Sequence, residues 1–186
     1  MTGYSIALFF HLLSLLLAVV CASITMYAAL RMRSTTCADD ARQWLVLNGR
    51  IMRLFPVAGL GLLATGSYMA QSISGWSEPW VMTSLSGLGC IVLLGAGVDG
   101  NRSRALGREL TVHGFSDRAR HLVRDPMAWT AKLTATTLML AVMFIMTTKP
   151  AAITSAAALL VALCAGVLSA FPFWKTPPFT EATSTQ

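Results

Sequence analysis

The sequence predicts an all-α fold, a polytopic transmembrane helical bundle of five spans with its N-terminus outside and its C-terminus inside. Of the 186 residues, 55% are apolar and only 12% are charged, whereas a soluble domain has about 25% charged residues. The mean hydropathy is +0.63, and the basic residues lie between long uncharged stretches. Each stretch approaches the roughly 20 apolar residues that cross a bilayer. We therefore expect one membrane domain at 1–172 and a flexible cytoplasmic tail at 173–186.

The five spans are expected at residues 4–30, 52–70, 80–98, 127–148 and 151–171. The first resembles a signal peptide, but it is too long and lacks a basic segment before it, so we interpret it as a retained span. Trp76 and Trp80 precede or begin the third span, where aromatic residues mark a membrane interface. Only Thr147-Thr148-Lys149-Pro150 separates the last two spans. This break predicts a tight antiparallel hairpin.

Arginine and lysine set the expected orientation, because cytoplasmic loops carry the excess of basic residues. The first and third loops together hold eleven arginines, whereas the second loop has no basic residue and the hairpin has only Lys149. The arginines are Arg31, Arg33, Arg42, Arg50, Arg53, Arg102, Arg104, Arg108, Arg118, Arg120 and Arg124. Loops one and three are therefore expected inside, in a bacterial-type inner membrane.

Two local patterns predict further structure. Ser116 precedes a short basic amphipathic segment at 117–124 that ends before Pro126, the pattern of a capped helix lying on head groups. Glycines gather in the second span and in the third, which predicts close contact between these two helices. They are Gly59, Gly61 and Gly66 in the second span and Gly87, Gly89, Gly95 and Gly97 in the third.

A stripe of small and polar residues runs along the first span. After His11 it contains Ser14, Ala18, Cys21 and Thr25 at spacings of three and four. Small and hydroxyl residues let membrane helices pack closely, so the stripe predicts a packing seam. His11 is the only histidine within the spans, and ionisable residues there are functional candidates by default. It is also a candidate ligand of haem b or copper, or a proton acceptor.

The second ligand that haem or copper would need is the open question. His113 and His121 lie in the third loop, so a haem would require a methionine or a second copy of His11. On the fourth span, Met139, Met143 and Met146 share one face, and thioether sulfur suits Cu(I). Methionine also fills gaps in apolar cores, and both interpretations stay open.

Charged residues flanking the spans are expected at lipid head groups. Arg50 and Arg53 precede the second span, and Lys132, one turn inside the fourth, can extend to the interface. Arg53 could instead be buried against Asp99. Nucleic acid is an unsuitable partner for basic residues placed this way. The four cysteines show no metal or disulfide spacing.

Several short motifs resemble a family of predicted bacterial integral membrane proteins of unknown function, similar to copper-resistance D-type and protoporphyrinogen-oxidase-type membrane proteins. The resemblance covers residues 4–150. Its motifs are Phe10-His11-Leu12-Leu13, Arg53-Leu54-Phe55 with Pro56 and Gly59, Leu63-Ala64-Thr65-Gly66, Trp76, Trp80 and Lys149-Pro150. It implies a compact bundle in which His11 is the residue of interest. The haem-binding oxidase-type relatives carry a lysine after a tryptophan in a later helix. Here Trp129 and Lys132 lie on the fourth span rather than the third, and the fifth span has no counterpart.

Three functions remain at this point. The first is a non-enzymatic protein that packs or assembles with partners, either a second copy or another membrane protein. The second is a membrane redox or metal-handling protein that uses His11. The third is a small transporter subunit. No nucleophile–base pair or phosphate-binding loop supports a hydrolytic or phosphoryl-transfer enzyme.

Overall fold

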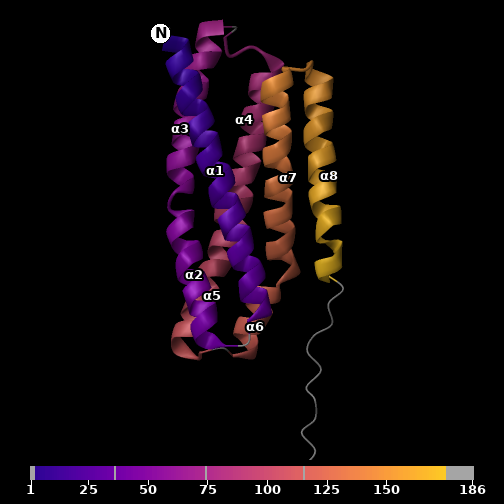
Figure 1. The fold of residues 1–186 in the computed structure, drawn as a ribbon. Coiled ribbons are helices and arrows are strands. Elements are labelled where there is room, and N and C mark those ends of the chain that lie inside the picture. The colour runs from indigo at the N-terminus through magenta and orange to yellow at the C-terminus, as the bar shows by residue number, and fades with distance from the viewer. Residues whose placement is uncertain (1–2, 36, 74, 115, 175–186) are drawn as a thin grey trace, which may run out of the picture.

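The computed structural model describes residues 3–35, 37–73, 75–114 and 116–174, and every regular element in this part of the chain is a helix (Figure 1). Five helical segments are long and apolar enough to cross a membrane, which confirms the predicted all-α bundle of five spans. The helices are α1 (Gly3–Ser34), α2 (Ala38–Met52), α3 (Phe55–Ile73), α4 (Pro79–Val92), the π-helix η1 (Leu93–Asp99), α5 (Gly100–Val112), α6 (Asp117–Arg124), α7 (Pro126–Thr148) and α8 (Ala152–Trp174). Residues 175–186, most of the predicted tail, lie outside the described residues.

The helix ends follow local chemistry. The Ser116 hydroxyl accepts a hydrogen bond from the Ala119 amide, so Ser116 caps α6 as predicted. Asp125 caps α7 in the same way, through the Met127 amide at 2.9 Å, and Pro126 occupies the first turn, where its missing N–H costs nothing. Lys149 ends α7 in the left-handed conformation, with φ of 46°. Pro150 follows it, and together they produce the predicted hairpin.

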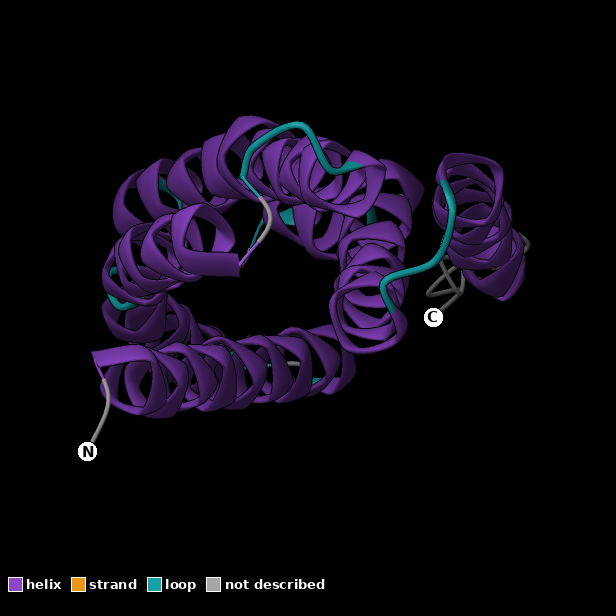
Figure 2. Ribbon diagram, turned by 90° about the horizontal axis from the view of Figure 1, so that it is seen from above, coloured by secondary structure: helices purple, strands orange, loops and turns teal. Residues whose placement is uncertain are grey.

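The spans form two groups. α1 packs mainly on α3 and α2, whereas α7 packs on α8, α4 and η1. Viewed along the bundle axis, most helices form a ring, and α8 stands outside it beside α7 (Figure 2). Thr137 on α7 donates a 2.8 Å hydrogen bond to the Ala162 carbonyl of α8. Gly166 lies against Thr134, leaving no room for a Cβ atom.

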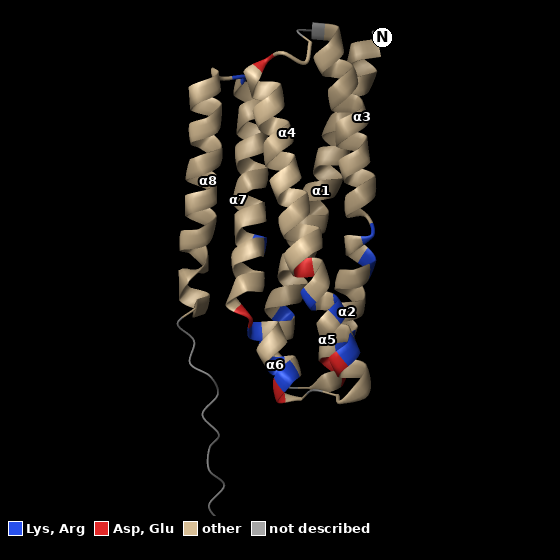
Figure 3. Ribbon diagram, turned by 180° about the vertical axis from the view of Figure 1, so that it is seen from behind, with Lys and Arg blue, Asp and Glu red and all other residues tan. Residues whose placement is uncertain are grey.

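A cluster of charged residues marks one end of the bundle, which we call the charged end (Figure 3). Here α2, α5, α6 and the last turns of α1 form a helical cap. Its buried core consists of Ala29, Met32, Ala41, Leu106, Leu110, Ala119 and Trp129. The segments that were expected as long loops are therefore largely helical. α6 packs against this core through Ala119 and is not free to lie flat on a membrane surface.

The glycines do not bring the second and third spans together. Gly61 and Gly66 on α3 face Ser14 and His11 of α1, and Gly87 on α4 faces Val142 and Leu159. No neighbouring atom lies within 4 Å of a Cβ added at Gly89, Gly95 or Gly97. The predicted contact was wrong, because each helix uses its small residues against a different neighbour.

Candidate functional site

His11 lies in the seam between α1 and α3, where its ring is half buried. Its Nδ1 atom is 2.9 Å from the Thr65 hydroxyl oxygen. That hydroxyl donates its single proton to the Gly61 carbonyl at 2.6 Å, so we infer that His11 donates through Nδ1–H. The remaining nitrogen, Nε2, then holds the lone pair in the neutral ring. Gly66 makes the approach possible, since a Cβ there would lie 3.3 Å from His11 Cε1.

Ser14 continues the seam, and the rest of the predicted stripe is buried. Ser14 lies against Gly61, so closely that a Cβ on this glycine would collide with its hydroxyl. Ala18, Cys21 and Thr25 are all buried. Small residues on both helices thus let α1 and α3 approach, as in other membrane interfaces.

The predicted methionines lie elsewhere. Met139, Met143 and Met146 are half buried on α7, which packs on α4, α8 and η1 rather than on the α1–α3 seam. The face of α7 in closest contact with its neighbours carries Thr134, Leu138, Ala141 and Ile145 instead. The structure therefore does not bring the methionines to His11.

The charged end contains a second polar site that joins α7 to η1. Lys132 Nζ lies 2.5 Å from Asp99 Oδ2, and the two side chains are only 13% and 11% exposed. Lys132, Arg50 and Arg53 were expected to reach head groups, with Arg53 as an alternative partner of Asp99. Instead Lys132 pairs with Asp99, because the end of the third span places a carboxylate within its reach. Arg50 and Arg53 are both exposed.

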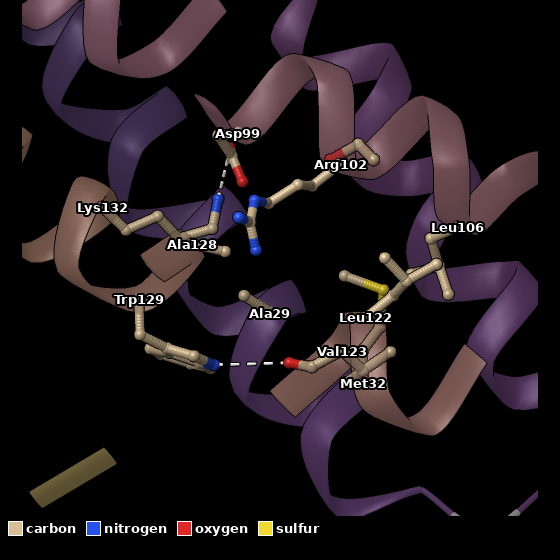
Figure 4. Close-up of a pocket in the computed structure, with 11 residues that line it drawn as sticks. Ala29, Met32, Asp99, Arg102, Leu106, Leu122, Val123, Ala128, Trp129 and Lys132 are labelled. Atoms are coloured by element: carbon tan, nitrogen blue, oxygen red, sulfur yellow. Dashed lines mark hydrogen bonds and ion pairs between the residues drawn. The ribbon is translucent and has the colours of Figure 1, made fainter. Parts of the chain in front are cut away.

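A half-open cavity of about 40 Å³ adjoins this pair. Since one water needs about 10–15 Å³ of such volume, the cavity has room for a few waters. Arg102 reaches into it beside the pair (Figure 4), and Arg102 also forms an ion pair with Asp125. The two cations thus face two carboxylates, so the site is balanced in charge.

An aromatic cluster closes the site on the α8 side. The rings of Trp129 and Phe173 stack with centroids 4.6 Å apart. The Arg33 guanidinium lies 4.9 Å from the Phe173 centroid and 5.6 Å from that of Trp129. The Trp174 indole N–H donates to the Thr130 hydroxyl at 3.1 Å. The ends of α1, α7 and α8 are thereby joined.

Sequence reasoning missed this site as a unit. Asp99 is the only acidic residue within the predicted spans or one residue beyond them, and that was the available signal. No comparable signal in the sequence indicated that Lys132 is the partner of Asp99 or that a π-helix forms here. Among the residues that the structure describes, no group of three or more His, Cys, Asp or Glu side chains is placed to hold a metal ion.

Comparisons with protein-family models, with curated proteins and with solved structures found no match for this chain. The resemblance to the copper-resistance D-type and protoporphyrinogen-oxidase-type proteins therefore stays a prediction. The same holds for haem or copper at His11.

Proposed function

We propose that the chain is a non-enzymatic protein of a bacterial-type inner membrane whose bundle serves assembly with a partner in the bilayer. The observation that carries this proposal is the use of polar groups within the spans. His11 bonds to Thr65, Lys132 to Asp99, and Thr137 to the Ala162 carbonyl. Each joins two helices, the structural use to which membrane proteins put such groups.

The distribution of charge supports an N-out, C-in orientation. The eleven arginines lie at the charged end or in its cap, while the opposite end holds Glu78 and Lys149 among the described residues (Figure 3). The positive-inside rule then places the cap in the cytoplasm.

The outer half of α1 supplies an assembly surface. Outside the seam it exposes Phe9, Phe10, Leu12, Leu13 and Leu16, and the main neighbours of α1 are only α3 and α2. A partner helix would cover these side chains, which otherwise face lipid.

Site-specific photo-cross-linking in native membranes tests assembly. A photoreactive residue at Leu13, on the exposed face, should give a discrete protein adduct, either of twice the chain mass or of a defined partner. The same residue at Ala18, which is buried on the same helix, is the matched control and should give no intermolecular adduct. Leu168 of α8 is exposed and serves as the reference for a lipid-facing position. The proposal would be contradicted if Leu13, like Leu168, gave lipid adducts alone.

A second function, binding of haem b or Cu(I), is favoured by one specific observation. The hydrogen bond to Thr65 occupies Nδ1, so Nε2 is the ring nitrogen that would bind a metal, the arrangement that metal-binding histidines commonly show. Because the methionines of α7 do not pack on the seam, the other ligand would come from a second copy of His11.

An optical spectrum and metal analysis of purified protein separate the two functions. Protein expressed with sufficient haem and copper should be colourless and metal-free if His11 serves packing. A Soret band or stoichiometric copper that is lost in His11→Ala and retained in Ser23→Ala, an exposed change on the same helix, would establish the ligand function instead.

A further inference from the structure

The third span and the cap helix α5 belong to one continuous helical segment, Pro79–Val112. Within it, η1 replaces α-helical by π-helical hydrogen bonding at Leu93–Asp99. A π-turn contains one residue more than an α-turn, and π-turns inside α-helices often mark functional positions. One additional residue changes the phase of everything that follows by about 100°, since an α-helix has 3.6 residues per turn. The direction in which α5 faces therefore depends on η1.

The rotation that η1 gives to α5 is the one that packs α5 into the cap. In the observed register Leu106 and Leu110 are 5% and 3% exposed in the cap core. A Cβ on Gly107 would lie 3.5 Å from Leu45 of α2. A turn of about 100° would carry these residues away from α2 and α6.

Asp99 is the last residue of η1, so its position depends on the same register. In the intact chain an α-helical segment would turn Asp99 by about 100°, so its 2.5 Å pair with Lys132 on α7 depends on the π-turn. An interaction made in one of two conformations shifts the equilibrium toward that conformation. Loss of a partner in a buried pair is costly, so this bias is strong.

The surroundings allow the register to change. Added Cβ atoms at Gly95 and Gly97 of η1 would meet no atom within 4 Å, so this side of η1 is open, while its other side packs on α7. The cavity beside the pair gives the Asp99 side chain room to move (Figure 4). The charges beside the cavity, Asp99 and Asp125 against Arg102 and Lys132, balance. The cavity therefore does not favour the binding of an additional anion.

We propose that the Asp99–Lys132 ion pair holds the continuous helix in its π-helical register, and that breaking the pair turns α5 and releases it from the cap. The device couples a contact inside the bundle to the position of a charged surface helix. It is independent of whether the protein assembles with a partner or binds a ligand at His11.

Cross-linking between α2 and α5 tests this coupling. Leu45→Cys and Gly107→Cys are introduced together after the exposed Cys37, Cys90 and Cys164 have been replaced by alanine. We expect efficient cross-linking in the parent and a severalfold lower yield after Asp99→Asn. The exchanged pair Asp99→Lys with Lys132→Asp should restore the yield. Asp117→Asn, which removes an exposed carboxylate from α6, is the matched control and should change nothing.

Deletion of Ala96 separates register from general stability. Removing one residue from η1 converts the π-turn to an α-turn while preserving the phase of α5. The deleted protein should therefore cross-link as the parent does, and Asp99→Asn should no longer reduce the yield in it. Size-exclusion chromatography verifies that each variant is folded. An unchanged cross-linking yield in Asp99→Asn would overturn the proposal. So would an equal reduction by Asp99→Asn in the chains with and without Ala96, or a loss of cross-linking when Ala96 alone is deleted.

Discussion

The ammonium of Lys132 on α7 lies 2.5 Å from the carboxylate of Asp99 at the end of η1. Both side chains are largely withdrawn from the surface. A pair in this position connects α7 to the end of the third span. Its strength depends on both partners being present, because a lone buried charge is far less stable than a buried pair.

Lys132→Met should therefore lower the free energy of unfolding by about 3–5 kcal/mol, because Asp99 is left buried without its cation. Replacing both residues, Lys132→Met with Asp99→Leu, should cost much less than the single change. Unfolding in mixed detergent micelles, followed by tryptophan fluorescence, measures the difference. A double variant as unstable as the single one would show that the pair is not the source of the loss.

The hydrogen bond between His11 and Thr65 should contribute measurably to the α1–α3 seam. Thr65→Val removes the acceptor, and a double-mutant cycle with His11→Ala should give a coupling of about 0.6 kcal/mol, and at most about 1.7 kcal/mol. Thr83→Val is the matched control, since the Thr83 hydroxyl is bonded only within its own helix, to the Pro79 carbonyl. No coupling in the cycle would mean that the bond does not form in the membrane.

The five spans could be predicted because their signal is physical and local. Backbone groups must be satisfied within the bilayer, so an uncharged run of this length is necessarily helical. The observed Pro126–Thr148 and Ala152–Trp174 differ from the predicted spans by at most three residues at each end.

The cap helices and the polar site could not be predicted in the same way. α2 and α5 are short and amphipathic, and their packing depends on contacts such as Leu45 with Gly107, far apart in the chain. The π-turn leaves no mark in composition, because the glycines of η1 also fit a packing motif. The seam residues were identified from their spacing, but the choice of Thr65 as partner of His11 depends on how two helices cross.

The proposed orientation predicts which surface positions can be labelled from outside. The experiment uses intact cells whose outer membrane has been permeabilised. A membrane-impermeant maleimide should label Ser77→Cys, which lies between α3 and α4. It should leave Cys37, which lies between α1 and α2, unlabelled. Cys37 should react only after the membrane is opened. The measurement uses a background in which Cys90 and Cys164, the other exposed cysteines, are alanine. The reverse pattern would invert the topology.

The contact between α7 and α8 should depend on the absence of a side chain at Gly166. A Cβ at this position would collide with the backbone of Thr134 and crowd two threonine hydroxyls. Gly166→Ala should therefore lower the free energy of unfolding by about 1–3 kcal/mol, the usual cost of overpacking. Gly89→Ala, in α4, is the matched control because no atom lies within 4 Å of its added Cβ. It should be neutral or stabilising, since alanine favours a helix over glycine by about 1 kcal/mol. Thermal unfolding of both variants in the same detergent measures the two changes in stability. Equal effects would mean that α8 does not pack closely on α7, because only close packing distinguishes these two glycines.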